Sequence, residues 1–63
     1  MKVGDMVRFR ILKSNQELID EFGYGLVEAV YREERTVTVI WPKKNWSWRT
    51  FEWAYLEVVN EGI

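Results

Sequence analysis

The residues best suited to binding chemistry in this chain are aromatic, and they concentrate toward its C-terminal end. Trp46, Trp48, Trp53 and Tyr55 lie close together in the sequence, with Arg49 among them. Exposed aromatic rings bind by burying apolar area and by stacking, and arginine adds directed hydrogen bonds. These five residues indicate a surface that binds another protein or a second copy of the chain, with Arg49 as its polar anchor.

Three arginines give the same aromatic residues a second interpretation. Arg8, Arg10 and Arg49 would form a basic stripe on adjacent strands, and with Trp46 or Trp48 they would hold phosphates and stack bases. The simpler alternative is that these arginines form cross-strand ion pairs with carboxylates. The candidate carboxylates are Glu28, Glu52 and Glu57. The net charge of −1 favours a protein partner over a nucleic acid.

No constellation of residues points to catalysis. The chain contains neither histidine nor cysteine, so the commonest general base, the thiolate nucleophile and the usual zinc ligands are all missing. The pairs Asp20-Glu21 and Glu33-Glu34 are adjacent in sequence, which does not place two carboxylates on one reacting atom. We predict a non-enzymatic protein with no metal site, no cofactor and no small-molecule substrate.

Length and composition limit the remaining choices. The chain has 63 residues, which predicts a single domain over 1–63. Its hydrophobic fraction of 48% argues against disorder, and no apolar run has the roughly 20 residues of a membrane span. The N-terminal residues lack the apolar stretch of a signal peptide. We therefore expect a cytoplasmic location.

Alternation of apolar and polar residues predicts most of the strands. Residues 7–11 place Val7, Phe9 and Ile11 on the core side of a first strand. Residues 24–31, 36–41, 46–52 and 56–59 provide four more strands, and Pro42 ends the third. Residues 53–55 are short enough for a single 3₁₀ turn, and we expect residues 60–63 to fray.

The first loop and the second strand carry less regular signals. Ser14 and Glu17 fit a helix capping box, so residues 14–22 predict one short helical turn, with Gly23 at its end; an irregular loop is the alternative. Gly25 indicates a close approach of backbones. Val27 and Val30 both look buried although they are three residues apart, which predicts a β-bulge.

Five short strands in so small a chain favour a closed barrel, because closure removes exposed edges. The order of signals resembles the SH3-like barrels that include KOW and Tudor modules. Gly4-Asp5-x-Val7 opens the chain, and a long first loop leads to Gly25-x-Val27-x-x-Val30. Val37-x-Val39-x-Trp41 comes next, and Leu56-Glu57-Val58-Val59 closes the chain. The resemblance implies an all-β, five-stranded SH3-like barrel with a short helical turn in the first loop. It says little about function, because such folds host many functions.

Two narrower groups share parts of this pattern. The opening Met-Lys-Val-Gly-Asp and the Trp-rich fourth strand resemble short SH3-like proteins of tailed phages that infect cyanobacteria. That resemblance implies the host cytoplasm or the virion as location. The segment from Val37 to Asn45 and the ending Leu56-Glu57 show a weaker similarity to the small, peripheral SH3-like protein of photosystem I, which would imply docking on a membrane complex.

The surplus of aromatic residues is the main functional signal. Five strands with alternate residues inward give roughly 12–15 core positions. Any single tryptophan is more simply explained as core, because large aromatics are highly buried on average. All four together do not fit one small interior. We therefore expect some of them at the surface, where exposed aromatic clusters mark interaction sites.

Overall fold

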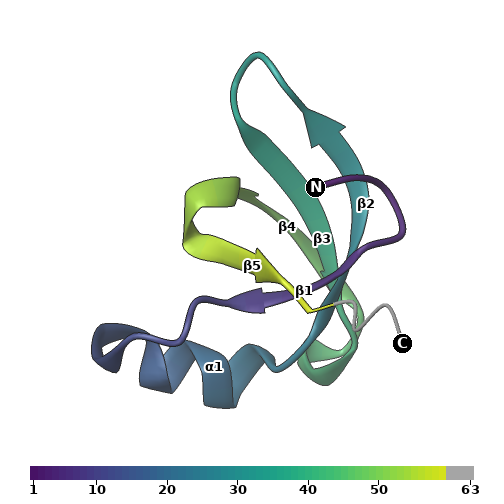
Figure 1. Cartoon of the computed structure of the whole chain (residues 1–63). Coiled ribbons are helices and arrows are strands. Elements are labelled where there is room, and N and C mark those ends of the chain that lie inside the picture. The colour runs from purple at the N-terminus through teal and green to yellow at the C-terminus, as the bar shows by residue number, and fades with distance from the viewer. Residues whose placement is uncertain (60–63) are drawn as a thin grey trace.

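A computed structural model describes residues 1–59, which form five antiparallel strands in one strongly curved sheet, together with a short helix (Figure 1). The tail that was expected to fray, residues 60–63, lies outside the described residues. The strands are β1 (Met6–Phe9), β2 (Gly25–Tyr31), β3 (Thr36–Trp41), β4 (Ser47–Glu52) and β5 (Leu56–Val58). The helical segments are η1 (Lys13–Asn15), α1 (Gln16–Phe22), η2 (Pro42–Lys44) and η3 (Trp53–Tyr55).

The strand order β4-β3-β2-β1-β5 follows the chain except for β5, which returns to the free edge of β1. This arrangement confirms the predicted all-β, five-stranded barrel-like fold with a short helix in the first loop. The register of β2 and β3 shifts between Val27 and Ala29, which is the predicted bulge. Pro42 follows the last residue of β3 and begins η2, a position that tolerates proline, which has no N–H to donate to the strand ladder.

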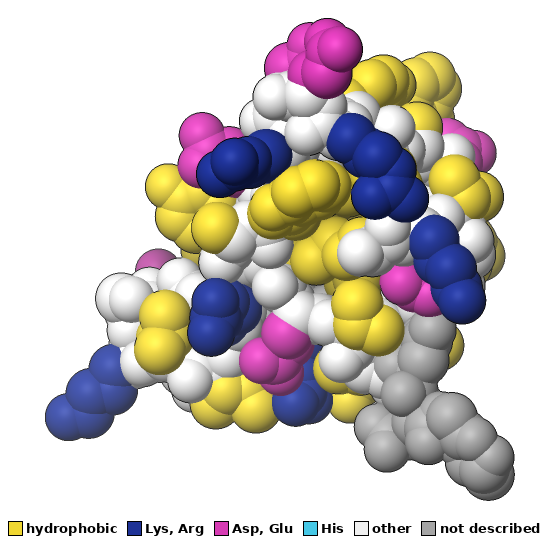
Figure 2. Space-filling model, turned by 45° about the horizontal axis from the view of Figure 1, so that its top comes forward, with side chains coloured by type: hydrophobic (Ala, Val, Ile, Leu, Met, Phe, Trp, Pro, Cys, Tyr) yellow, Lys and Arg dark blue, Asp and Glu magenta, His cyan; other side chains and the backbone are white. Residues whose placement is uncertain are grey.

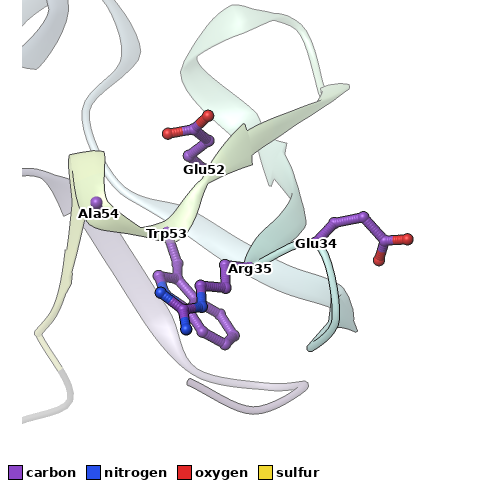
Figure 3. Close-up of a pocket in the computed structure, with 5 residues that line it drawn as sticks. All are labelled: Glu34, Arg35, Glu52, Trp53 and Ala54. Atoms are coloured by element: carbon purple, nitrogen blue, oxygen red, sulfur yellow. The ribbon is translucent and has the colours of Figure 1, made fainter.

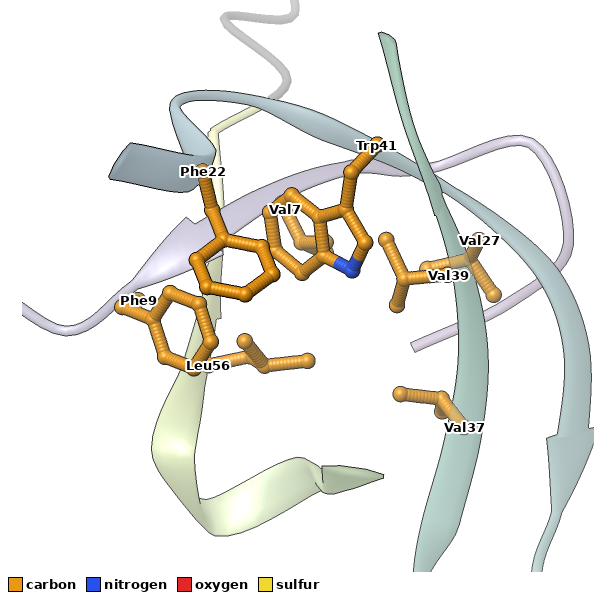
Figure 4. Packing of buried hydrophobic residues seen from close by; sticks show 8 residues of the cluster. All are labelled: Val7, Phe9, Phe22, Val27, Val37, Val39, Trp41 and Leu56. Atoms are coloured by element: carbon orange, nitrogen blue, oxygen red, sulfur yellow. The ribbon is translucent and has the colours of Figure 1, made fainter. Parts of the chain in front are cut away.

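Eight buried hydrophobic side chains form the core, and three of them are aromatic (Figure 4). The rings of Phe9 and Trp41 stack in parallel, with centroids 5.3 Å apart. Phe22 meets Trp41 edge-on at 5.1 Å, and the partly buried Phe51 does so at 5.9 Å. The core residues are Val7, Phe9, Phe22, Val27, Val37, Val39, Trp41 and Leu56.

Helix α1 is held against η2 by polar contacts around Phe22. The Nζ atom of Lys43 donates to the backbone carbonyl of Asp20 at 2.6 Å, and Lys44 forms an ion pair with Glu21. The ammonium group of Lys44 also lies 5.4 Å from the centroid of the Phe22 ring. Its hydrogen bond and its positive charge lower the pKa of Glu21 below the ordinary value.

Two sequence predictions for the first loop are wrong in detail. Ile11 is 63% exposed and outside the core, because β1 ends at Phe9 and the inward alternation ends with it. The capping box of Ser14 and Glu17 is absent: α1 begins at Gln16, with Asn15 at the N-cap and no side-chain capping hydrogen bond. Gly23 does end the helix, with φ of 65° and its N–H donated to the carbonyl of Ile19.

Gly25 lies where β2 passes directly over two core side chains. A Cβ atom at this position would lie 2.4 Å from Cγ1 of Val39 and 2.8 Å from Cε3 of Trp41. Both neighbours are fully buried, so neither has room to move away. The close backbone approach predicted from the sequence is confirmed.

Replacing Gly25 with alanine is therefore expected to destabilise the fold. Overpacking of this kind costs about 1–3 kcal/mol, and the two short contacts place Gly25→Ala at the upper end. Urea unfolding measures the difference in free energy. Gly4→Ala is the control, because nothing lies within 4 Å of its Cβ and only its φ of 96° opposes the change. Equal losses for the two variants would contradict the packing argument.

The Glu21–Lys44 pair predicts a pH dependence of the contact between α1 and η2. Because the folded pKa of Glu21 is lowered, the pair stabilises the helix above the ordinary value of 4.5, and this contribution is lost as the pH falls through the lowered pKa. Hydrogen exchange of α1 amides, corrected for the intrinsic pH dependence, should accelerate in that range. Glu21→Gln should remove this acceleration, and an unchanged pH response in that variant would contradict the assignment.

Candidate functional site

The four tryptophans divide between the interior and the surface. Trp41 is fully buried, and the half-buried Trp53 packs against the core. Trp46 and Trp48 are 64% and 69% exposed, more than any other large hydrophobic residue described. The expectation that the four do not share one interior is thus met. These two exposed rings define where a candidate site begins.

Trp48 belongs to a line of apolar residues across the outside of the sheet. It pairs with Ile40 on β3, Ile40 pairs with Leu26 on β2, and Leu26 pairs with Met6 on β1. We call these four residues the outer row. Trp48, Leu26 and Met6 are exposed, and Ile40 is partly exposed. Figure 2 shows how hydrophobic side chains reach the surface between lysine and arginine side chains on one face of the molecule.

The backbone at Trp46 has an unusual conformation for a large residue. Asn45 and Trp46 both have positive φ, 64° and 62°, in the connection between β3 and β4. The N–H of Trp46 donates to the carbonyl of Trp41 at 3.0 Å, which closes this connection. A left-handed conformation costs a residue with a Cβ about 1–2 kcal/mol, and glycine commonly follows asparagine in such turns. Trp46 thus adopts a backbone conformation that is unfavourable for a residue with a Cβ atom, although its side chain is exposed.

The five residues predicted as a partner-binding surface are not gathered at one place within a single copy. Trp46 and Trp48 lie at the start of β4, whereas Trp53 and Tyr55 belong to η3, beyond its end. The length of β4 separates the two groups by roughly 13 Å or more. Arg49 pairs with Val39 and so faces the inner side of the sheet, where its guanidinium lies 5.7 Å from the Phe22 ring.

A half-open hollow of about 310 Å³ lies beside Trp53, where the turn between β2 and β3 meets the end of β4. The N–H of Trp53 donates to the carbonyl of Arg35 at 3.0 Å and fixes the turn there. Figure 3 shows the carboxylates of Glu34 and Glu52 extending in different directions. The two acids thus do not converge on one point within the hollow.

The basic stripe predicted from the sequence does not lie on adjacent strands. Arg8 and Arg49 belong to β1 and β4, which are separated in the sheet by β2 and β3. The Nε atom of Arg8 instead donates to Oε2 of Glu57 at 2.7 Å, which is the cross-strand pairing considered as the alternative. This hydrogen bond raises the pKa of the Arg8 guanidinium. Arg10 is exposed and lies just after β1.

Sequence reasoning missed Met6, Leu26 and Ile40 as members of an exposed surface. Each lies on the solvent side of its strand, where alternation predicts a polar residue. The sequence signal that could have identified them is an apolar residue, in each of three strands, at a position where the alternation predicts a polar one. Joining them into one row also requires the cross-strand register.

Two kinds of feature are absent from residues 1–59. No group of three or more acidic, cysteine or histidine side chains there could hold a metal ion. No helix in that part of the chain has the length and hydrophobicity to cross a membrane.

The strained tryptophan gives a prediction about stability. Trp46→Gly should raise the free energy of unfolding by about 0.5–1 kcal/mol, because relief of the left-handed strain exceeds the extra chain entropy of glycine. Arg35→Gly is the matched control, since Arg35 is also exposed and has φ of 59°. Urea unfolding should show similar gains. A loss confined to Trp46→Gly would mean that its side chain stabilises the fold.

Comparisons with known proteins add no assignment to this geometry. No family model matches the chain, and neither the curated proteins nor the solved structures include a significant match to it.

Proposed function

We propose that this protein is a non-enzymatic binding module that holds another protein, or a second copy of itself, on the aromatic surface around β4. The observation that carries the proposal is the exposure of Trp46 and Trp48, the second of which belongs to the outer row that crosses four strands. Contiguous apolar side chains on a small domain mark interaction surfaces. Aromatic residues are enriched at the buried centres of such interfaces.

The magnitude of the available apolar area supports a binding role. A buried aromatic side chain contributes roughly 150–250 Å², and at about 25 cal/mol per Å² the 69% of Trp48 that is exposed would contribute about 3–4 kcal/mol before the costs of association. Tryptophans of this kind are typical hot spots of interfaces. The strain at Trp46 supports the same interpretation, because strained backbone conformations cluster at functional sites.

Nucleic-acid binding through Arg8, Arg10, Arg49 and the two exposed tryptophans is the alternative. The net charge of −1 and the pairing of Arg8 with Glu57 weaken it. It predicts an affinity for single-stranded oligonucleotides that falls steeply with salt. Salt-dependent quenching of tryptophan fluorescence by an oligonucleotide would favour this alternative.

Replacing Trp48 should remove protein binding without unfolding the domain. Trp48→Gln is expected to weaken the affinity at least about 30-fold, the effect of losing a hot spot of 2 kcal/mol. The measurement is quantitative capture on the immobilised protein, followed by titration of the captured protein. Tyr31→Gln is the matched control, since Tyr31 is exposed on the same outer face but outside the row. Equal capture by all three proteins would contradict the proposal.

A further inference from the structure

The strand that carries Trp48 has an unpaired edge. Within residues 1–59, β4 pairs only with β3, and no backbone hydrogen bond joins residues 47–52 to any other segment. The pairing of β3 with β4 runs through six consecutive residue pairs without a bulge. β4 contains neither proline nor lysine, two residues that commonly block strand edges, although its inward-facing Arg49 is a charge of the kind that can oppose pairing. The backbone edge itself is unpaired and can accept a strand that gives Arg49 a suitable neighbour.

We propose that a second copy of the chain pairs antiparallel with this edge, with the twofold axis at Thr50, so that two sheets join into one. This inference rests on the proposed function and names the bound protein as a second copy. A twofold arrangement is the commonest form of self-association, because the same surface is used by both copies.

Side-chain alternation and charge select the register. Trp48, Thr50 and Glu52 face outward, whereas Ser47, Arg49 and Phe51 face inward, and opposed residues in a sheet must share a face. A twofold axis at Arg49 would oppose two arginine charges, which is destabilising. An axis at Phe51 would pair fewer residues of the strand. The axis at Thr50 pairs residues 48–52 of one copy with residues 52–48 of the other.

The Thr50 register opposes no like charges. Arg49 lies opposite Phe51 of the second copy, and Trp48 lies opposite the second copy's Glu52. Thr50 faces its own equivalent, beside the Thr38–Thr50 contact that already joins their hydroxyl oxygens at 2.9 Å within one copy. Both the apolar and the charged residues of β4 thereby find acceptable neighbours.

The same arrangement brings together aromatic groups that one copy keeps apart. An antiparallel pairing places the Trp46 end of one β4 next to η3 of the other, which carries Trp53 and Tyr55. Trp46, Trp48 and Tyr55 are 64%, 69% and 56% exposed. At roughly 150–250 Å² each when fully buried, they would supply about 300–450 Å² per copy, around half of what a standard interface buries on each partner. The strand edge and the exposed Arg49, Thr50 and Glu52 supply further area.

Disulfide trapping tests the pairing and its register together. The chain has no cysteine, so Thr50→Cys introduces a single thiol. Opposed residues of an antiparallel pair have Cα atoms about 4.5–5.5 Å apart, within the range that a disulfide spans. Mild oxidation of Thr50→Cys should give a covalent dimer. Arg49→Cys and Phe51→Cys should each form no covalent dimer when oxidised alone and should form a mixed covalent dimer when combined.

The outcomes separate this inference from the proposed function. The unmodified protein should show a dimer mass in sedimentation equilibrium, and circular dichroism verifies that each variant is folded. A monomeric mass at all concentrations, with no cross-linking of folded Thr50→Cys, would overturn the dimer, and the proposed function would stand if Trp48→Gln still lost a captured protein. Equal cross-linking of all three single-cysteine variants would overturn the register.

Discussion

The parallel stack of Phe9 on Trp41 is the contact on which the other elements depend. It joins β1 to β3, which are not neighbours in the sheet, and so holds the curved sheet closed on itself. Phe22 brings α1 onto this pair, and Phe51 brings β4. A chain of 63 residues without a disulfide has few other means of fixing its elements, so these four rings act as the centre of the fold.

The aromatic centre also determines what must remain outside. Because Trp41, Val39 and Val37 turn inward on β3, their partners on β4 turn inward as well, and the alternate residues of both strands lie on the outer face, where Thr38 is covered by its neighbours. Trp48 is therefore exposed, and Ile40 partly exposed, because both lie on the face opposite to Trp41. The sheet has no second layer over this outer face within the described residues, so the outer row stays available for contact.

Local patterns predicted the elements of this fold well. The alternation in β3, the glycine that passes over Val39 and the bulge between Val27 and Ala29 all follow from the types of neighbouring residues. The exposure of Ile11 could not be predicted, because the end of β1 depends on where β5 and the first loop leave the sheet. The end of a strand depends on pairing with segments that are distant in the sequence, and local alternation contains no information about that pairing.

The candidate site was predictable in its residue types and not in its arrangement. The Trp-rich fourth strand identified Trp46 and Trp48, but Met6 and Leu26 join Trp48 only through the register of three strand pairs. Register is set by long-range pairing, and a shift of one residue would move each side chain to the opposite face. The left-handed backbone of Trp46 could not be predicted either, since asparagine followed by tryptophan is not a strong turn signal.

Positive φ and exposure coincide at Trp46, as they do at Arg35, but at Trp46 the exposed side chain is a large aromatic one. A small domain has a net stability of about 0.05–0.15 kcal/mol per residue, so a cost of about 1–2 kcal/mol at Trp46 is a sizeable fraction of the whole. A residue that stabilised the fold would be buried in exchange, yet Trp46 remains 64% exposed. Its exposed area would be buried only if something outside the single copy covered it. The free edge of β4 begins at the next residue, so a strand that pairs there would lie beside the indole.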